Sequence, residues 1–455
     1  MKSVVVDGSY THTLNIPDEW EFSELKNVIN LVGGNQPPKS KFLYEASDNT
    51  IRLIQIRDYK SDQHKVFIQK SDAKRFVNKT DVMIGRYGPP IFQILRGLEG
   101  AYNVALMKAE PVLGSYDKDF LYYYLSNQDI YNYVNSASDR TAGQSGVNKE
   151  HLEKYPVPVV PLAEQQEIVR QLDVMLAQVE QIKARLDAIP AILKKFRQSV
   201  LADAVSGKLT EGANCSKWIK STIGAEFKCI DGDRGKNYPK KEDYQTEGYC
   251  LFLSTKNVRK FGFLFDDKVF ISKQKHEQLR NGTLERDDLI ITTRGTLGHI
   301  ASYDKNVPFD VVRINSGMLI LRKTKQNLLN EFMMLLLASP KFQRIIEEQR
   351  TGSAQPQLPA KILKEFEIEL PSLDEQKLIV QKVESYFELI EKTEDTVQSA
   401  QKRVNLLTQS ILAKAFSGEL TAEWREQHQD LITGVNSAEA LLAKIQAERE
   451  ASKPV

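Results

Sequence analysis

Apolar residues recur at alternating steps of three and four along two long stretches of the chain. The first series is Ile168, Leu172, Met175, Val179, Ile182, Leu186, Ile189, Leu193, Phe196 and Val200. The second is Ile379, Val383, Tyr386, Ile390, Thr393, Val397, Ala400, Val404, Leu407 and Ile411. A period of 3.5 residues is typical of a coiled-coil seam rather than of a helix lying on a globular core. We therefore expect a helix from 164 to 205, roughly 60 Å long at 1.5 Å per residue, and a second helix like it.

The two stretches are copies of one another. The first opens Pro161-Leu-Ala-Glu-Gln-Gln-Glu-Ile-Val and the second Pro371-Ser-Leu-Asp-Glu-Gln-Lys-Leu-Ile-Val. They close as Ser199-Val-Leu-Ala-Asp-Ala-Val-Ser-Gly-Lys-Leu-Thr and Ser410-Ile-Leu-Ala-Lys-Ala-Phe-Ser-Gly-Glu-Leu-Thr. The prolines precede the expected helix starts, and the glycines of the closing blocks stand where a helix ends. Pro190 lies inside the first copy, but the heptad keeps its register there, so we expect a kink rather than a break.

Each seam requires a partner of matching length, because every apolar side chain it buries contributes ~1.5–3 kcal/mol. The other copy of the repeat is such a partner. Pairing of a duplicated unit with itself gives a pseudo-two-fold contact, which favours antiparallel helices, although heptads alone do not fix the direction. Two unrelated surface helices, each packed on its own domain, are the alternative.

Before the first helix, the chain mixes short strand patterns with one helical pattern. Residues 1–15 are polar and predict an arm. The expected elements of residues 16–160 are strands at 28–32, 52–58, 81–85, 102–107 and 155–160, and an aromatic-rich helix from Phe120 to Tyr133. The strand from Asp81 runs into the turn Arg86-Tyr87-Gly88, which Pro89-Pro90 ends, and a polar loop covers 140–148.

Residues 214–370 repeat this order. Trp218 corresponds to Trp20, and Asp231-Gly232 to Gly33-Gly34. The further matched segments are 253–258 with 54–59, 288–295 with 81–88, 332–337 with 120–125 and 350–358 with 140–148. The chain therefore predicts an α+β fold: two similar globular domains joined by two long antiparallel coiled-coil helices, with an internal pseudo-two-fold repeat. The expected boundaries are 1–160, 161–213, 214–370, 371–425 and a C-terminal tail 426–455, helical from Ser437 to Glu450.

Charge is balanced overall, with 62 basic and 60 acidic residues. By segment it is uneven: residues 1–160 hold 19 of each sign, whereas residues 214–370 hold 26 basic and 20 acidic. A nonspecific nucleic-acid coat would be more basic, but a local basic patch is compatible with this balance. Cys215, Cys229 and Cys250 match no zinc or disulfide pattern, and we expect reduced thiols. With no signal peptide and no apolar run long enough for a membrane span, we expect a soluble cytoplasmic protein.

Catalytic motifs are missing from the sequence. It holds neither a glycine-rich nucleotide loop with an Asn/Asp-Pro-Pro-aromatic box nor a P-loop. Pro17-Asp18 followed by Glu24-Leu-Lys26 resembles a nuclease pattern, but the spacing is tight and the second copy has no equivalent. The six histidines are scattered without ligand spacing. We expect no catalytic residue and no metal site.

Basic and amide residues at strand ends and in polar loops remain as the candidate chemistry. Arginine pairs with guanine and Asn or Gln with adenine in the major groove, whereas lysine suits phosphates. Solvated surface charge is the alternative for any single residue. The predicted DNA-binding residues are Arg57, Arg86, Tyr87, Arg140, Gln144, Lys256, Asn257, Arg259, Arg294, Arg350 and Gln355.

The paired opening and closing blocks, together with Ile16-Pro-Asp-Glu-Trp20, resemble the specificity subunit of type I restriction-modification enzymes. The resemblance covers nearly the whole chain. It implies that each globular domain is a target-recognition domain that reads one half of a bipartite, asymmetric site in double-stranded DNA, and that the coiled coil sets the spacer. Half-sites read from one face lie roughly 34 Å apart, a separation that helices of this length can span.

The same resemblance implies partners and cofactors. Two modification subunits would dock on the helical regions and methylate adenine N6 with S-adenosylmethionine, and two restriction subunits would use ATP and Mg²⁺ to cleave DNA. This chain itself would bind no cofactor. A coiled-coil adaptor with two protein-binding domains, or an enzyme with an unfamiliar site, are the other function classes that the sequence leaves open.

Overall fold

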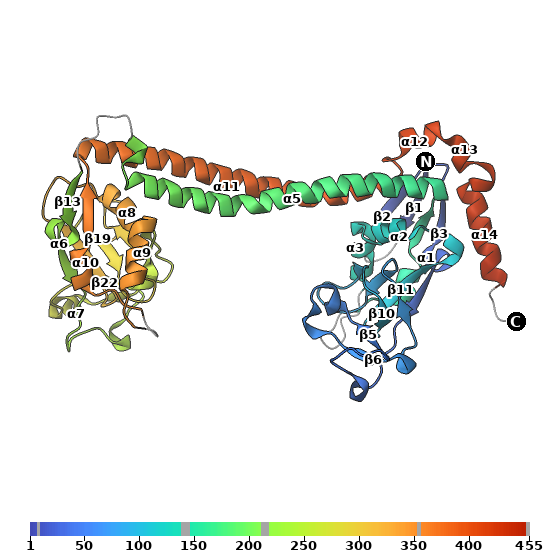
Figure 1. The fold of residues 1–455 in the computed structure, drawn as a ribbon, viewed down its shortest axis with the longest axis horizontal. Helices are drawn as coiled ribbons and strands as arrows, with labels where there is room; N and C mark the ends of the chain where they lie inside the picture. Colours follow the sequence, from blue (N-terminus) through green and yellow to red (C-terminus); the bar gives the residue numbers. More distant parts are fainter. Residues whose placement is uncertain (7–9, 138–145, 211–217, 353–355, 452–455) are drawn as a thin grey trace. The chain divides into compact units, whose positions relative to one another are not determined.

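The computed structural model describes residues 1–6, 10–137, 146–210, 218–352 and 356–451. The chain divides into two compact units, residues 1–185 with 400–455, and residues 186–399. Each unit holds one globular domain and part of two long helices, α5 (Leu162–Ala204) and α11 (Leu373–Phe416) (Figure 1). We call residues 1–160 the first globule and 214–370 the second. Helix α5 continues through Pro190 over 43 residues, so the prediction of an unbroken helix is confirmed.

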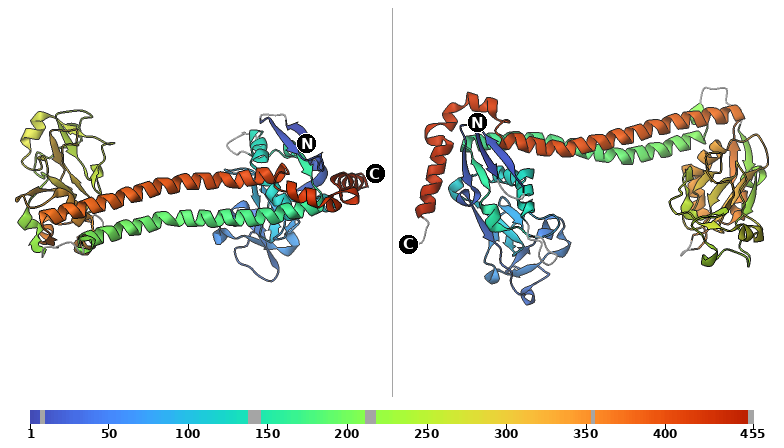
Figure 2. Two further views of the ribbon diagram at one scale, coloured as in Figure 1. Left: turned by 90° about the horizontal axis from the view of Figure 1, so that it is seen from above. Right: turned by 180° about the vertical axis from the view of Figure 1, so that it is seen from behind.

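The two long helices pack side by side in each unit (Figure 2). In the first unit, Ile168 and Leu172 from the start of α5 share a core with Leu412 and Phe416 from the end of α11. In the second unit the relation is inverted: Val200 and Ala204 from the end of α5 join Ile379 and Val383 from the start of α11. Because the start of one helix meets the end of the other in both units, the helices are antiparallel, as the repeat predicted.

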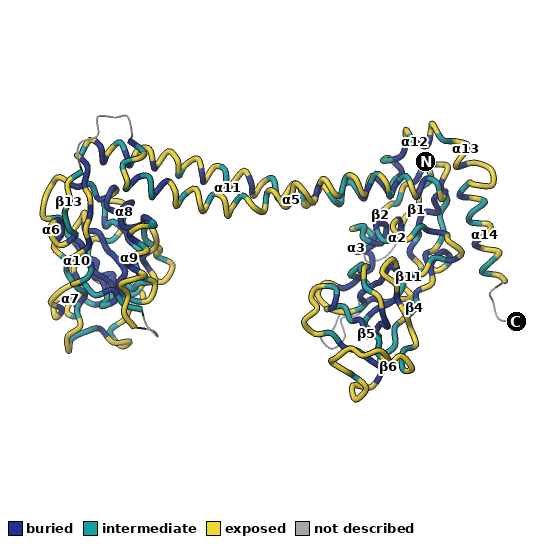
Figure 3. Tube along the Cα trace, in the orientation of Figure 1, coloured by how far each residue is buried: buried dark blue, intermediate teal, exposed yellow. Residues whose placement is uncertain are grey.

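Burial along the predicted seam is uneven (Figure 3). The seam residues nearest the globules, such as Ile168, Leu172, Ile379 and Val383, are buried. Others stay more than a third exposed, including Ile182 at 44% and Phe196 at 38%, although Phe196 packs edge-on against Tyr386 at 5.9 Å between ring centroids. A pair of helices covers only one narrow stripe of each partner, so the seam is only partly removed from water away from the globules.

The first globule is built on two four-stranded sheets. One has the order β4-β11-β8-β9 and the other β6-β5-β10-β7, in which β5 and β10 are parallel. The strands are β4 (Ile29–Gly33), β5 (Thr50–Ile54), β6 (Phe67–Gln69), β7 (Phe76–Val77), β8 (Val82–Gly85), β9 (Gln93–Leu95), β10 (Gly100–Tyr102) and β11 (Leu106–Pro111). A separate pair joins β3 (Glu21–Glu24) to β12 (Pro156–Val159).

The second globule repeats this topology. Its sheets have the orders β14-β22-β19-β20 and β18-β15-β21, and β15 and β21 are parallel. The strands are β14 (Phe227–Asp231), β15 (Cys250–Leu253), β18 (Phe270–Ile271), β19 (Leu289–Thr292), β20 (Ile300–Ser302), β21 (Val312–Ile314) and β22 (Met318–Lys323), with the pairs β13 (Ile219–Thr222) with β23 (Glu367–Leu370) and β16 (Val258–Arg259) with β17 (Gly262–Phe263). The predicted α+β repeat is therefore present.

Short helices lie between each sheet and the long helices. They are α2 (Lys118–Leu125) and α3 (Gln128–Ser136) in the first unit, and α8 (Asn330–Ala338) and α9 (Pro340–Gln349) in the second. The prediction of a single helix from Phe120 to Tyr133 was wrong, because the Asn127 side chain accepts the Asp129 N–H and caps a new helix there. The aromatic residues of α2 serve packing: the rings of Phe120 and Tyr124 meet the Phe416 ring edge-on, with 5.5 and 5.1 Å between ring centroids.

The remaining short helices complete the two units. They are α1 (Leu25–Val28), α4 (Lys149–Glu153), α6 (Ile223–Glu226), α7 (Lys273–Gln278), α10 (Ala360–Glu365), α12 (Ala422–Gln427), α13 (Gln429–Ile432) and α14 (Ala438–Ala451). Helix α14 confirms the predicted helical tail. It lies against the first globule (Figures 1 and 2), where Ala438 and Ile445 enter its core and the Arg449 guanidinium donates to the carbonyl oxygens of Lys26, Asn27 and Ile29.

Three further expectations for the first globule were wrong. The strand expected at 52–58 ends at Ile54, and Ile56–Tyr59 forms a 3₁₀ turn instead. The N-terminal segment is not an arm, because β1 (Lys2–Val6) and β2 (His12–Ile16) pair as antiparallel strands whose buried ends, Val6 and Ile16, join the core. The stretch from Tyr102 to Met107 is not one strand, because a turn at Asn103 separates β10 from β11. Asparagine favours such turns because its short side chain bonds to the nearby backbone.

The repeated Glu-Gln pair explains how each globule is fixed to the long helices. In the first unit, Glu164 is fully buried and accepts hydrogen bonds from the Trp20 indole N–H (2.8 Å) and the Thr421 hydroxyl (2.7 Å). In the second unit, Glu375 accepts the equivalent bonds from Trp218 (3.1 Å) and Thr210 (2.9 Å). Each glutamate thus ties its own globule to the closing block of the other copy.

The neighbouring glutamines complete these junctions. The Gln165 carboxamide accepts the Asp117 N–H and donates to the Ser115 and Val160 carbonyls. Gln376 makes the same set of bonds to Leu329, Asn327 and Pro371. A buried amide with both ends satisfied orients the chain without an unpaired polar group. The repeated sequence blocks therefore have the same structural role in both units.

Candidate nucleic-acid interface

In each globule, a turn that follows the central strand is held by a second loop. After β8, Tyr87 forms an isolated bridge with Gly146, and the Val147 N–H donates to the Arg86 carbonyl at 2.9 Å. After β19, Arg294 bridges with Gln357, and the Leu358 N–H donates to the Thr293 carbonyl at 2.9 Å. The strand-end turn and the end of the polar loop, which the sequence suggested separately, are neighbours in both globules.

A second turn, residues 103–105 and 315–317, lies beside the first; we call it the asparagine turn. The Asn103 side chain accepts the Ala105 N–H at 3.1 Å, and Asn315 accepts the Gly317 N–H at 2.9 Å. The carbonyl of the last residue of each turn accepts an N–H from the strand-end turn, from Arg86 (2.8 Å) and Arg294 (3.1 Å). These bonds fix the spacing between the two turns independently of the side chains that they display.

A 3₁₀ turn forms the third part of this surface: η2 (Ile56–Tyr59) in the first globule and η8 (Thr255–Asn257) in the second. A side chain added at Gly85 would lie 3.3 Å from Ile56, and one added at Gly317 would lie 2.9 Å from Thr255 and 3.6 Å from Arg294 Cβ. The glycines therefore allow the loops to approach closely. We call the three converging loops of each globule the candidate DNA face.

Asn257 is part of the framework of this face. It is 4% exposed, its carboxamide oxygen accepts from the Ser254 N–H and hydroxyl, and its NH₂ donates to the Leu264 and Asp267 carbonyls. Its counterpart in the first globule is Asp58, which is also 4% exposed and caps η2 through the Gln55 N–H. We therefore remove Asn257 from the candidate DNA contacts. The internal repeat already indicated this structural role of Asn257, since the matched residue, Asp58, carries a carboxylate.

The predicted residues of the first globule lie on or beside its face. Arg57 is exposed on η2, where one guanidinium nitrogen is 3.5 Å from the His64 carbonyl. Arg86 donates to the Val104 carbonyl of the asparagine turn at 3.4 Å and lies 5.3 Å from the Tyr87 ring centroid. Tyr87 is 37% exposed. The Arg86 side chain thus connects the two turns, and the Tyr87 ring is accessible.

In the second globule, Lys256 and Arg259 are exposed on and directly after η8, and Arg259 donates to the Lys256 and Val258 carbonyls. Arg294 is half-buried, and no described residue bonds to its guanidinium. Arg350 is exposed at the end of α9 and pairs with Glu347 at 3.2 Å. Arg294 is therefore the basic residue of the strand-end turn whose donors remain available. Arg140, Gln144 and Gln355 lie outside the described residues.

The asparagine turns were missed from the sequence. Their signal was available, because Asn103 and Asn315 occupy matched positions and Gly317 follows the second asparagine. Arg313 was also missed, since it interrupts an apolar strand pattern. It is 4% exposed, and its guanidinium donates to the carbonyls of His276, Leu279 and Asn281 and to His276 Nδ1. Burial lowers the pKa of Arg313.

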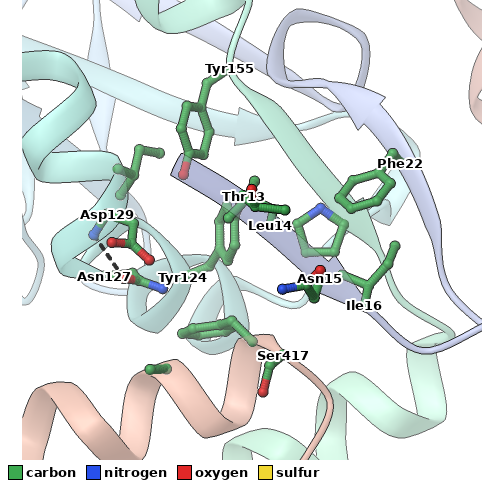
Figure 4. A pocket seen from close by; sticks show the side chains of 14 residues that line it. Thr13, Leu14, Asn15, Ile16, Phe22, Tyr124, Asn127, Asp129, Tyr155 and Ser417 are labelled. Carbon is green, nitrogen blue, oxygen red and sulfur yellow. Dashed lines mark hydrogen bonds between the residues drawn. The ribbon is translucent and has the colours of Figure 1, made fainter. Parts of the chain in front are cut away.

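A separate hollow of about 180 Å³ lies in the first unit (Figure 4), and its lining residues are not those of the candidate DNA face. It is bounded by β2, by α2 and α3, and by the end of α11, with Phe22, Tyr124 and Tyr155 among its aromatic walls. Val205, Leu336 and Phe342 line a much smaller hollow of about 30 Å³ at the corresponding place in the second unit. Both sit where a globule meets a long helix, and they follow from the repeated packing there.

Among the described residues, no three His, Cys, Asp or Glu side chains are placed to hold a metal ion. Burial raises the pKa of Cys229 to about 11 and that of Cys250 to about 12, so both are protonated thiols near neutral pH. Across the described part of the chain, no helix has the length and apolar character that a membrane crossing requires.

Comparison with known proteins agrees with this architecture. The family model described as the type I restriction modification DNA specificity domain matches twice, at residues 17–191 and 216–399. The chain is 31% identical to the type I restriction enzyme EcoBI specificity subunit of Escherichia coli, over 98% of this chain and 96% of that protein. It is 30% identical to the EcoKI specificity subunit of E. coli strain K12, over 96% and 97% of the two chains.

Solved structures show the same fold. One, from work on complex assembly and conformational transition of the type I R-M system, superposes with a TM-score of 0.65 at 18% identity, covering 89% of this chain and 99% of the other. The HsdS subunit from Thermoanaerobacter tengcongensis superposes with a TM-score of 0.59, also at 18% identity, covering 89% and 98%. With two copies of the domain and relatives matched over 96% and 97% of their length, this chain belongs to the family of type I restriction-modification DNA specificity subunits.

Proposed function

We propose that this chain is the DNA-recognition subunit of a type I restriction-modification enzyme, and that each globule reads one half of a bipartite, asymmetric site. The observation that carries the proposal is the candidate DNA face: the same three loops converge in both globules, two of them joined by the same backbone bonds, and they carry different side chains. Arg86-Tyr87 corresponds to Thr293-Arg294, and Arg57 to Lys256. A common frame with different donors suits recognition of two different base sequences.

The long helices have a second role in this proposal. Their antiparallel pairing supports a rod that sets the spacer between the half-sites, because neither helix is interrupted between the globules. Modification subunits would dock on the helical regions, where several apolar side chains remain exposed, such as Val174 at 51% and Leu406 at 71%. Exposed apolar side chains that recur along a helix pair suit a protein partner better than water.

Catalysis belongs to the partner subunits in this proposal. Two modification subunits would transfer a methyl group from S-adenosylmethionine to adenine N6, and two restriction subunits would use ATP and Mg²⁺ to translocate and cleave DNA. The role of this chain is to position them, so its substitutions should change where DNA is modified rather than the chemistry of methyl transfer.

Methylome sequencing of a cell that expresses the chain with its modification subunits tests the proposal. We expect methyladenine at one bipartite motif, with two defined parts separated by a spacer of fixed length. Gel-shift assays of the assembled complex, on duplexes with and without this motif, distinguish recognition from a protein-binding adaptor. Equal affinity for both duplexes, together with no methylated motif, would contradict the proposal.

A further inference from the structure

A polar hollow of about 450 Å³ adjoins the candidate DNA face of the second globule. One wall is the loop 231–237, which follows β14, and the other is the segment 278–281, which follows α7. The Arg234 guanidinium reaches from the first wall to the Ser316 carbonyl of the asparagine turn at 3.5 Å. Gly232 also lies against this turn, since an added side chain there would meet the Asn315 carbonyl at 2.2 Å. The hollow and the face are therefore parts of one surface.

The two carboxylates that line the hollow are bonded within its walls. Asp231 pairs with Arg234 at 3.2 Å. Asp233 accepts the Gly235 N–H at 2.8 Å and the Arg280 N–H at 2.7 Å, so it joins the two walls. Burial opposes ionisation of Asp233, but these backbone bonds outweigh it and lower its pKa, so the carboxylate stays charged and bonded near neutral pH.

Two cations of the hollow remain free to bind a ligand. Lys236 stands on one wall and Arg280 on the other, and both side chains are exposed. In the described part of the chain, neither the Lys236 ammonium nor the Arg280 guanidinium forms an ion pair or hydrogen bond with another side chain. The charge that the hollow presents to solvent is therefore positive, despite its two carboxylates.

Arg313 strengthens this positive field from behind. Its buried guanidinium holds the segment 276–281 through three carbonyl oxygens. Among the described residues it forms no ion pair, although the Asp233 carboxylate is near enough to act on its charge. A charge in a low-dielectric interior is weakly screened, so it raises the potential at the adjacent wall. The matched position in the first globule is Ala101, and its matched loop, residues 33–39, has Lys39 as its one basic residue, where the loop 231–237 has Arg234 and Lys236. The device belongs to the second globule.

We infer that this hollow binds backbone phosphate of the DNA duplex through Lys236 and Arg280, beside bases that are contacted from Arg294 and the asparagine turn. The inference rests on the proposed function and adds the place and type of one contact. A phosphate suits the site because two cations on facing walls surround an anion without base-specific geometry. Phosphate binding also explains why the segment 278–281 is held by the bonds of Arg313 and Asp233. A fixed segment keeps the backbone of Arg280 at a constant distance from that of Lys236.

The test is the double variant Lys236→Ala, Arg280→Ala in the full chain, assembled with its modification subunits. We expect affinity for a duplex that carries the methylated motif and for a duplex that lacks it to fall by the same factor. The slope of log K against log salt should become shallower by about one to two, since each phosphate contact contributes about 0.9. The methylated motif should stay unchanged.

The control removes two exposed cations of α10 in the same globule, Lys361→Ala with Lys364→Ala, and should leave the salt slope within error. Thermal unfolding checks that the test variant is folded, which we expect because Asp233 and Arg313 are retained. An unchanged slope, or a change in one base of the motif, would overturn the phosphate assignment while the wild-type complex still recognises its site. Failure of the wild-type complex to distinguish the two duplexes would instead refute the proposed function.

Discussion

The two globules share a frame and differ in what the frame displays. In both, corresponding backbone hydrogen bonds join the strand-end turn to the asparagine turn, and the N–H of Asn103 or Asn315 donates to the strand end that precedes the 3₁₀ turn. In the first globule the Arg86 side chain crosses between the turns to the Val104 carbonyl. In the second the arginine stands one position later, at Arg294, and its guanidinium has no partner among the described residues. Duplication preserved the bonds that hold the loops and left the displayed side chains free to vary.

At the junctions with the long helices, by contrast, the side chains are the same in the two halves. Trp20, Glu164 and Thr421 correspond to Trp218, Glu375 and Thr210 in residue type as well as in position. A buried carboxylate that accepts an indole N–H and a hydroxyl tolerates little change, because a lost partner leaves a buried donor unsatisfied. The comparison indicates where the two halves must remain alike and where they can differ.

The largest expected effect comes from cutting one junction. We expect Glu164→Ala to cost about 3 kcal/mol, because it leaves Trp20, Thr421 and the Arg425 guanidinium, 3.5 Å away, without their buried acceptor. Hydrogen exchange should increase in residues 1–185 and 400–455 and stay unchanged in residues 186–399. The matched variant Glu375→Ala should give the reverse pattern. Increased hydrogen exchange in both units of either variant would contradict the expectation that each junction stabilises only its own unit.

A substitution on the candidate DNA face of one globule should likewise affect only the half-site that this globule reads. We expect Arg294→Ala to weaken binding of the motif by about 2 kcal/mol if its guanidinium pairs with a guanine, with loss of preference at one position of one half-site only. The unfolding temperature should change little, since no described residue bonds to this guanidinium. The matched variant Tyr87→Ala should affect the other half-site. An equal loss of affinity for every duplex would reassign Arg294 to a phosphate.

The C-terminal tail makes the halves unequal, because a segment like α12–α14 follows only the second copy of the repeat. We expect Arg449→Ala to destabilise the first unit by about 1 kcal/mol, since several backbone carbonyls between Lys26 and Ile29 lose their donor. Exchange protection should fall in residues 26–30. Unchanged protection there would show that α14 contributes nothing through this contact.

The smallest effect is a pH dependence of the first junction. Burial raises the pKa of Glu164 above its usual value, although bonds from Trp20 and Thr421 oppose this. The folded chain therefore holds this proton more tightly than the unfolded chain. The stability gained by protonating Glu164 in the folded chain is complete below the pKa of Glu164 in the unfolded chain. It is lost as pH rises through the pKa of Glu164 in the folded chain. The difference in unfolding temperature between wild type and Glu164→Gln should vary over this window, and a constant difference would contradict the shift.

Much of the fold could be predicted from the sequence, because the heptad seam and the repeat are strong periodic signals. They gave both long helices, their antiparallel pairing and the order of the elements in each globule. The N-terminal hairpin and the division at Asn127 were missed, since short strands and caps depend on packing and on single hydrogen bonds. The candidate face was found only in part: the strand-end turns were identified, but the asparagine turns were missed, and the meeting of these turns depends on backbone bonds between distant segments. Asn257 was misassigned because an amide that caps a turn and one that contacts a base look alike in sequence.

The central claim is that the globules read separate half-sites at a distance that the long helices set. It is tested most directly by deleting one heptad from α5 and the facing heptad from α11, then sequencing the methylome of cells that express the complex. Seven residues shorten a helix by about 10 Å, or about three base pairs of duplex. We predict that both half-sites remain and that only the spacer between them changes. Altered half-site sequences with an unchanged spacer would contradict the account.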